Sequence, residues 1–462
     1  MVHRIVDKPR FIRCVAHGSE HPTYQPAELI APSPTFMIGS FVATPMTKLC
    51  YHSCLSPFTV SLLTHRTAIS WLTDKVSAIP DTDYPRPRSS SHAESIMAPI
   101  IRVAICHIAS IYLDATATTE KVLSWIGKAS QNGAQLVVFP EVCIPAYPYW
   151  SCLISPAETH DFFIRMAKES IYADGKEMAK IRHAAKQNRI FVSVGFSEKA
   201  RYSSATLWNS NMVISAEGEI LVHHRKLMPT FHEKLTWAPG DGHGLKVVDV
   251  PIVAARREDA GSAKLGMLIC GENTNPLARY AMIAQGEQIH ITTWPAKAAH
   301  RVLLGDEDSS VDDSKDASLP VRGKYDNLAV NRTRCSEHCF EAKCFGIICA
   351  SFMSPEIIDY LVTNAPEHAK GRVRSTYGLA AQAESRFLDT SGSPILGFTV
   401  DVEGNHHSCD ALRHEEGMLY ADLDMEQTIE GKQYHDVVGA YQRFDVFNLT
   451  VDTSRKMPCN FR

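Results

Sequence analysis

The sequence lacks two features: a hydrophobic run long enough to cross a membrane, and an excess of charge of one sign. No stretch approaches the roughly 20 apolar residues of a membrane-spanning helix. The 462 residues carry 47 Lys and Arg against 51 Asp and Glu, a formal net charge of −4. This balance creates no strong field for nucleic acid or for an anionic membrane surface. We therefore expect neither nucleic acid nor a membrane as a partner.

A regular spacing of cysteines is also missing. The 13 cysteines are odd in number and scattered, which argues against a disulfide framework and favours a reducing compartment. Cys335, His338, Cys339 and Cys344 come close together, but they lack the paired CxxC spacing of zinc sites. We interpret these four as packing residues. We expect a cytoplasmic protein without a metal.

The first 97 residues have no sustained hydrophobic period. Prolines cluster at residues 32–34 and 85–87, and a polar run follows at 89–92. Such composition favours a disordered extension that is not part of the main folded domain. An organellar targeting segment is the alternative, although the acidic residues in this region weigh against it. Met97, just before the first convincing strand, would make a sensible initiator, so residues 1–96 need not belong to the mature protein.

From residue 100 onward the pattern becomes regular. The expected strands are Ile100–Ile108, Ala134–Phe139, Ile190–Phe196, Asn211–Ile214, Ile220–His223, Leu265–Ile269, Ile289–Thr293, Phe345–Ala350 and Met418–Leu423. The expected helical stretches are Thr118–Asn132, Ala157–Gln187, Leu277–Gln285 and Tyr325–Phe340. Several strands are continuous apolar runs, which is typical of sheets covered on both faces in layered α/β folds. We expect one folded domain over residues 98–450, followed by a tail at 451–462.

An acidic segment, residues 305–320, interrupts this domain. Its centre reads DEDSSVDDSKD, with six carboxylates against one Lys. Charge repulsion and low hydrophobicity predict a solvated loop. A calcium loop would need an ordered ligand spacing and a glycine turn that are absent here.

Three polar residues follow buried strands directly. Glu141 follows LVVFP, Lys226 follows ILVHHR and Cys270 follows LGMLI. Ligands bind at strand ends in layered α/β proteins. Burying a Glu and a Lys separately would cost several kcal/mol each, so the two are expected to share one site.

The segments around these residues resemble the nitrilase superfamily of carbon–nitrogen hydrolases, and within it the nitrilase branch. The matching stretches are FPEVCIPAYPYW, HRKLMPTFHEKLTWAPGDG and LICGENTNPLARYAMIAQGEQIHITTWP. The resemblance covers roughly residues 100–450. It implies a four-layer α-β-β-α sandwich and a homo-oligomer. It also makes Glu141 the general base, Lys226 the cationic partner, Cys270 the nucleophile and Glu233 a second carboxylate that positions the others.

This residue set suits attack on a nitrile. A free thiol is only a few per cent thiolate at neutral pH, so a base must take the proton as sulfur attacks. Lys226 and the backbone N–H of Gly271 would stabilise the negative charge that develops on nitrogen. The resemblance implies that the nitrile and water are the only reactants and that no cofactor is required.

One position departs from the family pattern. Gly271 stands where nitrilases commonly have Trp, so we expect more room or more backbone freedom beside the thiol. Tyr147, Trp237 and Trp294 are candidate walls of the substrate pocket.

The resemblance predicts hydrolysis of an organic nitrile to a carboxylic acid and ammonia. The alternatives are a cyanide hydratase or an amidase of the same superfamily. A further alternative from another class is a catalytically silent scaffold with the same fold.

Overall fold

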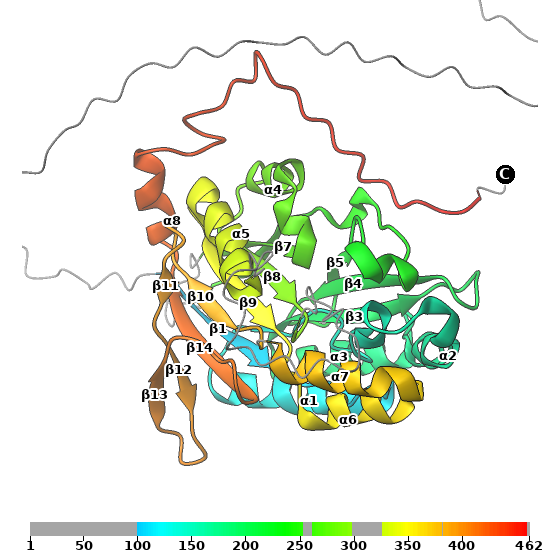
Figure 1. Ribbon diagram of the computed structural model, residues 1–462. Helices are drawn as coiled ribbons and strands as arrows, with labels where there is room; N and C mark the ends of the chain where they lie inside the picture. Colours follow the sequence, from blue (N-terminus) through cyan, green and yellow to red (C-terminus); the bar gives the residue numbers. More distant parts are fainter. Residues whose placement is uncertain (1–98, 253–260, 298–325, 381, 460–462) are drawn as a thin grey trace, which may run out of the picture. The chain divides into compact units, whose positions relative to one another are not determined.

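The computed structural model describes residues 99–252, 261–297, 326–380 and 382–459. Two β-sheets lie face to face, and helices cover their outer faces (Figure 1). This arrangement confirms the expected four-layer α-β-β-α sandwich. The predictions for residues 1–97 and for the acidic segment 305–320 concern regions outside the described residues. Among the described residues, none of the helices has the length and apolar character needed to cross a bilayer.

The first sheet has eight strands in the order β13-β12-β14-β1-β2-β3-β4-β5. Their bounds are β1 Ile100–His107, β2 Leu136–Val138, β3 Phe191–Lys199, β4 Leu207–Ile214, β5 Ile220–Arg225, β12 Gly397–Val400, β13 His406–Cys409 and β14 Gly417–Asp424. Strands β1, β2 and β3 run parallel to one another, and β14, β4 and β5 pair antiparallel with their neighbours. The carboxyl ends of β1, β2 and β3 therefore lie at one edge.

The second sheet has six strands in the order β11-β10-β9-β8-β7-β6. Their bounds are β6 Val248–Pro251, β7 Ser262–Ile269, β8 Ile289–Trp294, β9 Phe345–Ala350, β10 Arg386–Leu388 and β11 Pro394–Ile395. Strands β7, β8 and β9 are parallel, whereas β6 and β10 join them antiparallel.

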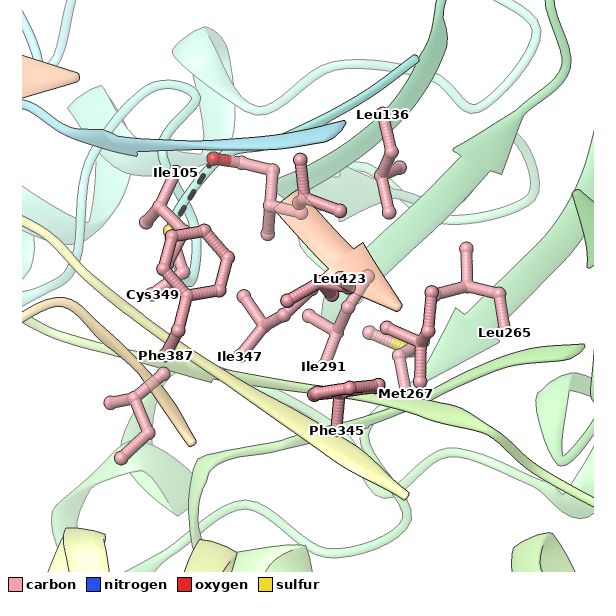
Figure 2. Packing of buried hydrophobic residues seen from close by; sticks show 14 of the residues in the cluster. Ile105, Leu136, Leu265, Met267, Ile291, Phe345, Ile347, Cys349, Phe387 and Leu423 are labelled. Atoms are coloured by element: carbon pink, nitrogen blue, oxygen red, sulfur yellow. Dashed lines mark hydrogen bonds between the residues drawn. The ribbon is translucent and has the colours of Figure 1, made fainter. Parts of the chain in front are cut away.

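The largest hydrophobic cluster fills the space between the sheets. Ile105 and Leu136 from one sheet and Met267 and Ile291 from the other belong to it (Figure 2). Successive strand residues point to opposite faces, so the alternate positions of β1, such as Ala104, belong to a second cluster under the helices. Burial on both faces explains why the apolar runs in the sequence do not alternate.

Helices α1 (Ala115–Gln131) and α3 (Lys176–Asn188) cover the outer face of the eight-stranded sheet. Helices α4 (Pro276–Ile283) and α5 (Asn327–Ala342) cover the six-stranded sheet (Figure 1). Three others are α2 (His160–Glu169), α6 (Pro355–Asn364) and α7 (Glu367–Leu379), and their buried residues share a third cluster. A short α8 (Gln427–Glu430) follows β14.

The expected single helical stretch Ala157–Gln187 is wrong, because it consists of α2 and α3 with a break at residues 170–175. In the break, Ile171 donates its N–H to Ser197 O and accepts from Lys199 N, both at 3.0 Å. Residue 171 therefore pairs with the carboxyl-terminal part of β3, beyond the short strand β2. Helices α6 and α7 and strands β6 and β10 to β13 were not expected from the sequence.

Candidate active site

The three strand-end residues meet at one place in the sandwich. Glu141 lies just beyond β2, Lys226 directly follows β5, and Cys270 directly follows β7. Lys226 Nζ lies 2.9 Å from Glu141 Oε1 and 2.7 Å from Glu233 Oε2, so one buried ammonium bridges two carboxylates. The side chains of Lys226, Glu141 and Glu233 are essentially inaccessible to solvent. This arrangement supplies the partners that isolated buried charges would lack.

Glu233 is held by three different donors. It lies in the 3₁₀ turn Phe231–Leu235. Its Oε2 accepts the N–H of Thr230 at 2.9 Å in addition to the Lys226 ammonium, and its Oε1 accepts the hydroxyl of Tyr147 at 2.9 Å. Both oxygens of Glu233 are thus occupied, which suits a residue that fixes the position of Lys226.

Glu141 has one occupied and one unoccupied oxygen. Its Oε1 accepts hydrogen bonds from Lys226 and from the Nδ2 of Asn209 on β4, the latter at 2.7 Å. Its Oε2 is buried and has no hydrogen-bond partner among the described residues. This second oxygen is therefore the atom available to accept a proton.

The protonation states of the three residues follow from their burial and mutual charges. Desolvation raises the pKa of Glu141 to about 7, although the Lys226 ammonium opposes the rise. Burial and the charge of Glu141 also raise the pKa of the Cys270 thiol well above its usual range. Burial alone would lower the pKa of Lys226, but the surrounding negative charges hold it well above its ordinary value. The cysteine is therefore a thiol at rest and requires a base.

Cys270 lies in a strained turn that two neighbouring side chains hold. Its φ is +52°, in the left-handed region that non-glycine residues rarely adopt. The Glu272 carboxylate accepts the Ile269 N–H at 2.7 Å and the His224 ring N–H at 2.9 Å. On the other side, Asn273 Nδ2 donates to Cys270 O at 3.0 Å. These bonds fix the backbone that carries the thiol.

A cavity of about 90 Å³ opens onto Cys270. Of the four predicted binding residues, Gly271, Tyr147 and Trp294 line it, together with Thr230, Phe231, His232, Glu233, Pro295, Lys297, Asn327, Asn331, Arg334 and Ala383. Trp237 does not line it; its ring packs edge-on against Tyr147, 5.6 Å between centroids. A larger cavity of about 190 Å³ beside α2 contains none of the predicted site residues.

The room expected beside Gly271 is not open. A Cβ placed on Gly271 would lie 2.6 Å from Thr230 Oγ1. Since atoms at that distance overlap, the Thr230 hydroxyl occupies the position into which a side chain at 271 would project.

Two groups of buried ligand-type residues converge among the described residues: Glu141, Glu233 and Cys270, and Glu287, His290 and His338. In the first group, the Lys226 ammonium already takes the cation position between the carboxylates. In the second, both oxygens of Glu287 are engaged by imidazole nitrogens at 2.6 and 2.7 Å. Hydrogen bonds thus account for both clusters.

The four residues considered as a zinc cluster are all buried. Cys335 and Cys339 lie on α5 and face Gly346 of β9, on the helix-covered side of the six-stranded sheet. Cys344 lies just before β9, and His338 pairs with Glu287. Asn209 and Asn273 were not anticipated as site residues. Asn273 lies in one of the segments that carry the family resemblance and Asn209 lies on β4, but the contacts of both depend on strand pairing and turn geometry.

Comparison with known proteins gives a consistent result. The family model described as carbon-nitrogen hydrolase matches residues 102–374. A nitrilase from Penicillium rubens is 32% identical over 363 residues, covering 78% of this chain and 96% of the relative. A cyanide hydratase from Stereum hirsutum is also 32% identical, covering 75% of this chain and 81% of the relative. The C. elegans NitFhit protein has a similar fold, with a TM-score of 0.51, 16% identity, and coverage of 78% of this chain and 69% of that one.

Proposed function

Because the chain belongs to the carbon–nitrogen hydrolases of the nitrilase superfamily, we propose that it hydrolyses an organic nitrile to the carboxylic acid and ammonia. The observation that supports this proposal most is the contact between Lys226 and two carboxylates beside a cavity that reaches Cys270. Such a site combines a nucleophile, a base and a fixed positive charge, which are the three groups that addition to a C≡N bond requires.

In the first half-reaction, Cys270 Sγ attacks the nitrile carbon. Glu141 takes the thiol proton through Oε2 and passes it to the nitrile nitrogen, giving a thioimidate. The Lys226 ammonium and the Gly271 N–H stabilise the negative charge on that nitrogen. Glu233 holds Lys226 in place, and Tyr147 in turn holds Glu233. The positive charge of Lys226 is therefore in position before the nitrile reacts.

In the second half-reaction, Glu141 activates a water molecule that adds to the thioimidate carbon. The tetrahedral intermediate expels ammonia and leaves a thioester on Cys270. A second water then releases the carboxylic acid and restores the thiol. No step consumes anything other than the nitrile and two water molecules.

A second candidate is hydration of cyanide to formamide, which the similarity to a cyanide hydratase favours. The two activities differ at the tetrahedral intermediate, which loses the thiol instead of ammonia in the hydratase. The segment Leu235-Thr236-Trp237-Ala238-Pro239-Gly240 is more similar to the organic-nitrile branch. We therefore rank the nitrilase activity first.

The test is a panel of aliphatic, arylaliphatic and aromatic nitriles, and free cyanide, with ammonia, acid and amide all measured. We expect acid and ammonia in equal amounts from at least one organic nitrile. Mass spectrometry of the stopped reaction should detect an adduct on the peptide that contains Cys270. Formamide from cyanide alone would favour the hydratase. The absence of acid, amide and adduct with every compound would favour the scaffold alternative.

A further inference from the structure

A chain of buried hydrogen bonds leads away from the nucleophile turn into the six-stranded sheet. Asn273 Nδ2 donates to Cys270 O at 3.0 Å and to Leu268 O at 3.2 Å. Both acceptors are carbonyl oxygens, so they fix the orientation of the Asn273 amide. The amide oxygen, Oδ1, therefore points the other way, toward His290 Nε2 at 2.9 Å.

The partners of His290 on β8 require it to carry two protons. Its Nε2 faces the amide oxygen of Asn273, and its Nδ1 lies 2.7 Å from the Glu287 carboxylate. Neither partner atom can donate, provided that Glu287 is ionised. Burial acts to raise the pKa of Glu287, but His290 and His338 hold it at about 2. Both ring nitrogens of His290 must therefore be N–H donors, which makes the ring an imidazolium.

His338 on α5 completes the group but has a different role. Its Nε2 lies 2.6 Å from the other oxygen of Glu287, and its ring stacks on His290 with centroids 3.6 Å apart. Burial lowers the pKa of His338 to about 4, and its Nδ1 has no hydrogen-bond partner among the described residues. His338 is therefore neutral and forms no hydrogen bond with Asn273 among the described residues.

The backbone leaves room for this group. Gly266 on β7 has no side chain, and a Cβ there would overlap Glu287 Oε1. Glu287, His290 and Asn273 are all at most 1% exposed. One carboxylate and one imidazolium together carry no net charge, as burial at this depth requires.

We propose that His290, held as an imidazolium by Glu287, is a positioning residue that fixes the nucleophile turn through Asn273. The inference rests on the proposed role of Cys270 as nucleophile. Cys270 has a strained backbone, and a strained conformation persists only where surrounding contacts determine it. The imidazolium orients the Asn273 amide, and the amide holds the carbonyl of Cys270. The thiol is thereby kept in place without any contact between His290 and substrate.

The test compares three variants that alter buried polar groups of the same cluster. His290→Gln removes the double donor, and Asn273→Asp keeps the shape of residue 273 but cannot donate to Cys270 O. His338→Gln is the matched control, since it changes the other partner of Glu287 and leaves Asn273 untouched. For each, we would measure the alkylation rate of Cys270 by iodoacetamide, with site-resolved mass spectrometry, alongside kcat, KM and the thermal midpoint.

We expect His290→Gln and Asn273→Asp to lower both the alkylation rate and kcat by about 10- to 100-fold, with KM little changed. A loss of this size is usual when a residue that holds an active-site group by a hydrogen bond is removed. His338→Gln should keep both the alkylation rate and kcat within about threefold of the wild-type values. This should hold even if its thermal midpoint falls as much as those of the other two variants. Rate losses that simply follow the midpoint in all three variants would overturn the proposal. Alkylation needs no turnover, so it reports on positioning even if wild type hydrolyses no nitrile.

A measurement on the unmodified protein covers the case in which a variant does not fold. The ¹⁵N spectrum of histidine-labelled protein should show a bonded proton on both ring nitrogens of His290. The His338→Gln spectrum identifies the His338 signals, and the ring signals of His290 are assigned through their bonds to the backbone of the same residue. A His290 ring with one bare nitrogen would overturn the imidazolium assignment.

Discussion

Among single residues, replacement of Cys270 should remove activity while leaving stability almost unchanged. We expect Cys270→Ala to abolish turnover, because Cys270 is the one cysteine among the described residues that line the cavity. A small buried thiol packs much like Ala, so the free energy of unfolding should change by only about 1 kcal/mol. Activity assays and thermal unfolding check this. Cys335→Ala is the control, since that buried thiol lies in the hydrophobic cluster; it should retain activity. Substantial turnover by Cys270→Ala would disprove the nucleophile assignment.

Glu141 should set the acidic limb of the pH profile. Its raised pKa of about 7 means that the proton-accepting carboxylate predominates only above that pH. Below it, kcat/KM should fall by about tenfold per pH unit. Asn209 donates to Glu141 Oε1 and stabilises the ionised form, so Asn209→Leu should move the midpoint to higher pH. A profile that stays flat down to pH values near an ordinary carboxyl pKa would contradict this assignment.

Gly271 and Thr230 should behave as a coupled pair. Gly271→Ala places a methyl group 2.6 Å from Thr230 Oγ1, and overpacking of this kind costs about 1–3 kcal/mol. We expect lower kcat/KM and lower stability. Adding Thr230→Ala should recover part of both, whereas adding Thr230→Ser should not, since the hydroxyl remains. Purely additive effects in this double-mutant cycle would argue against the contact.

The residues of the site differ in how far the sequence predicted them. Glu141 and Cys270 each follow an apolar run, so the end of a buried strand marked them, whereas Lys226 follows the mixed strand ILVHHR. Asn209 and His290 lie inside the strands LWNSNMVI and IHITTW, which carry other polar residues as well, so the sequence alone gives neither residue a distinct role. Their partners become visible only once the strand order is known. Asn209 on β4 reaches Glu141, which follows β2 on the far side of β3, and His290 on β8 reaches Asn273, which follows the neighbouring strand β7.

At the level of elements, Gly195 on β3 allows the Glu141 turn to approach the sheet. A Cβ on Gly195 would overlap Pro140 O and lie 2.7 Å from Val142 N. Gly195→Ala should therefore displace Glu141 and lower both activity and stability. Gly127→Ala on α1 is a matched control, because its nearest neighbour would be Asn188 Oδ1 at 3.9 Å. That helical change should leave activity intact and raise stability by about 0.5–1 kcal/mol. Kinetics and thermal unfolding of the two variants provide the measurement.

The elements themselves were predicted where burial on two faces gave long apolar runs. Strands β1, β7, β8 and β9 are examples. The stretch 157–187 was predicted as helical, although Ser170, Asp174 and Gly175 within it are poor helix formers. The break at residues 170–175 comes from Ile171 pairing with β3, a contact between residues distant in sequence. The short strands β10 to β13 likewise depend on pairing partners and have little apolar signal of their own.

For the whole chain, residues 1–96 should be dispensable. Every side chain of the proposed site and every strand of both sheets lies between residues 100 and 424. A protein that starts at Met97 should therefore show the kcat and KM of the full chain, measured side by side. An insoluble or inactive product would indicate that the segment belongs to the fold.

The proposed site is divided between the two sheets. Glu141 and Lys226 follow strands of the eight-stranded sheet, whereas Cys270 follows a strand of the six-stranded one. The path of the proton from thiol to carboxylate thus runs from one sheet to the other, and the thickness of the apolar layer sets its length. Met267 and Ile291 never meet a substrate, yet they help to determine that thickness (Figure 2). Divergence in reaction rate among such enzymes can therefore originate in the hydrophobic core, where a survey confined to pocket residues would miss it.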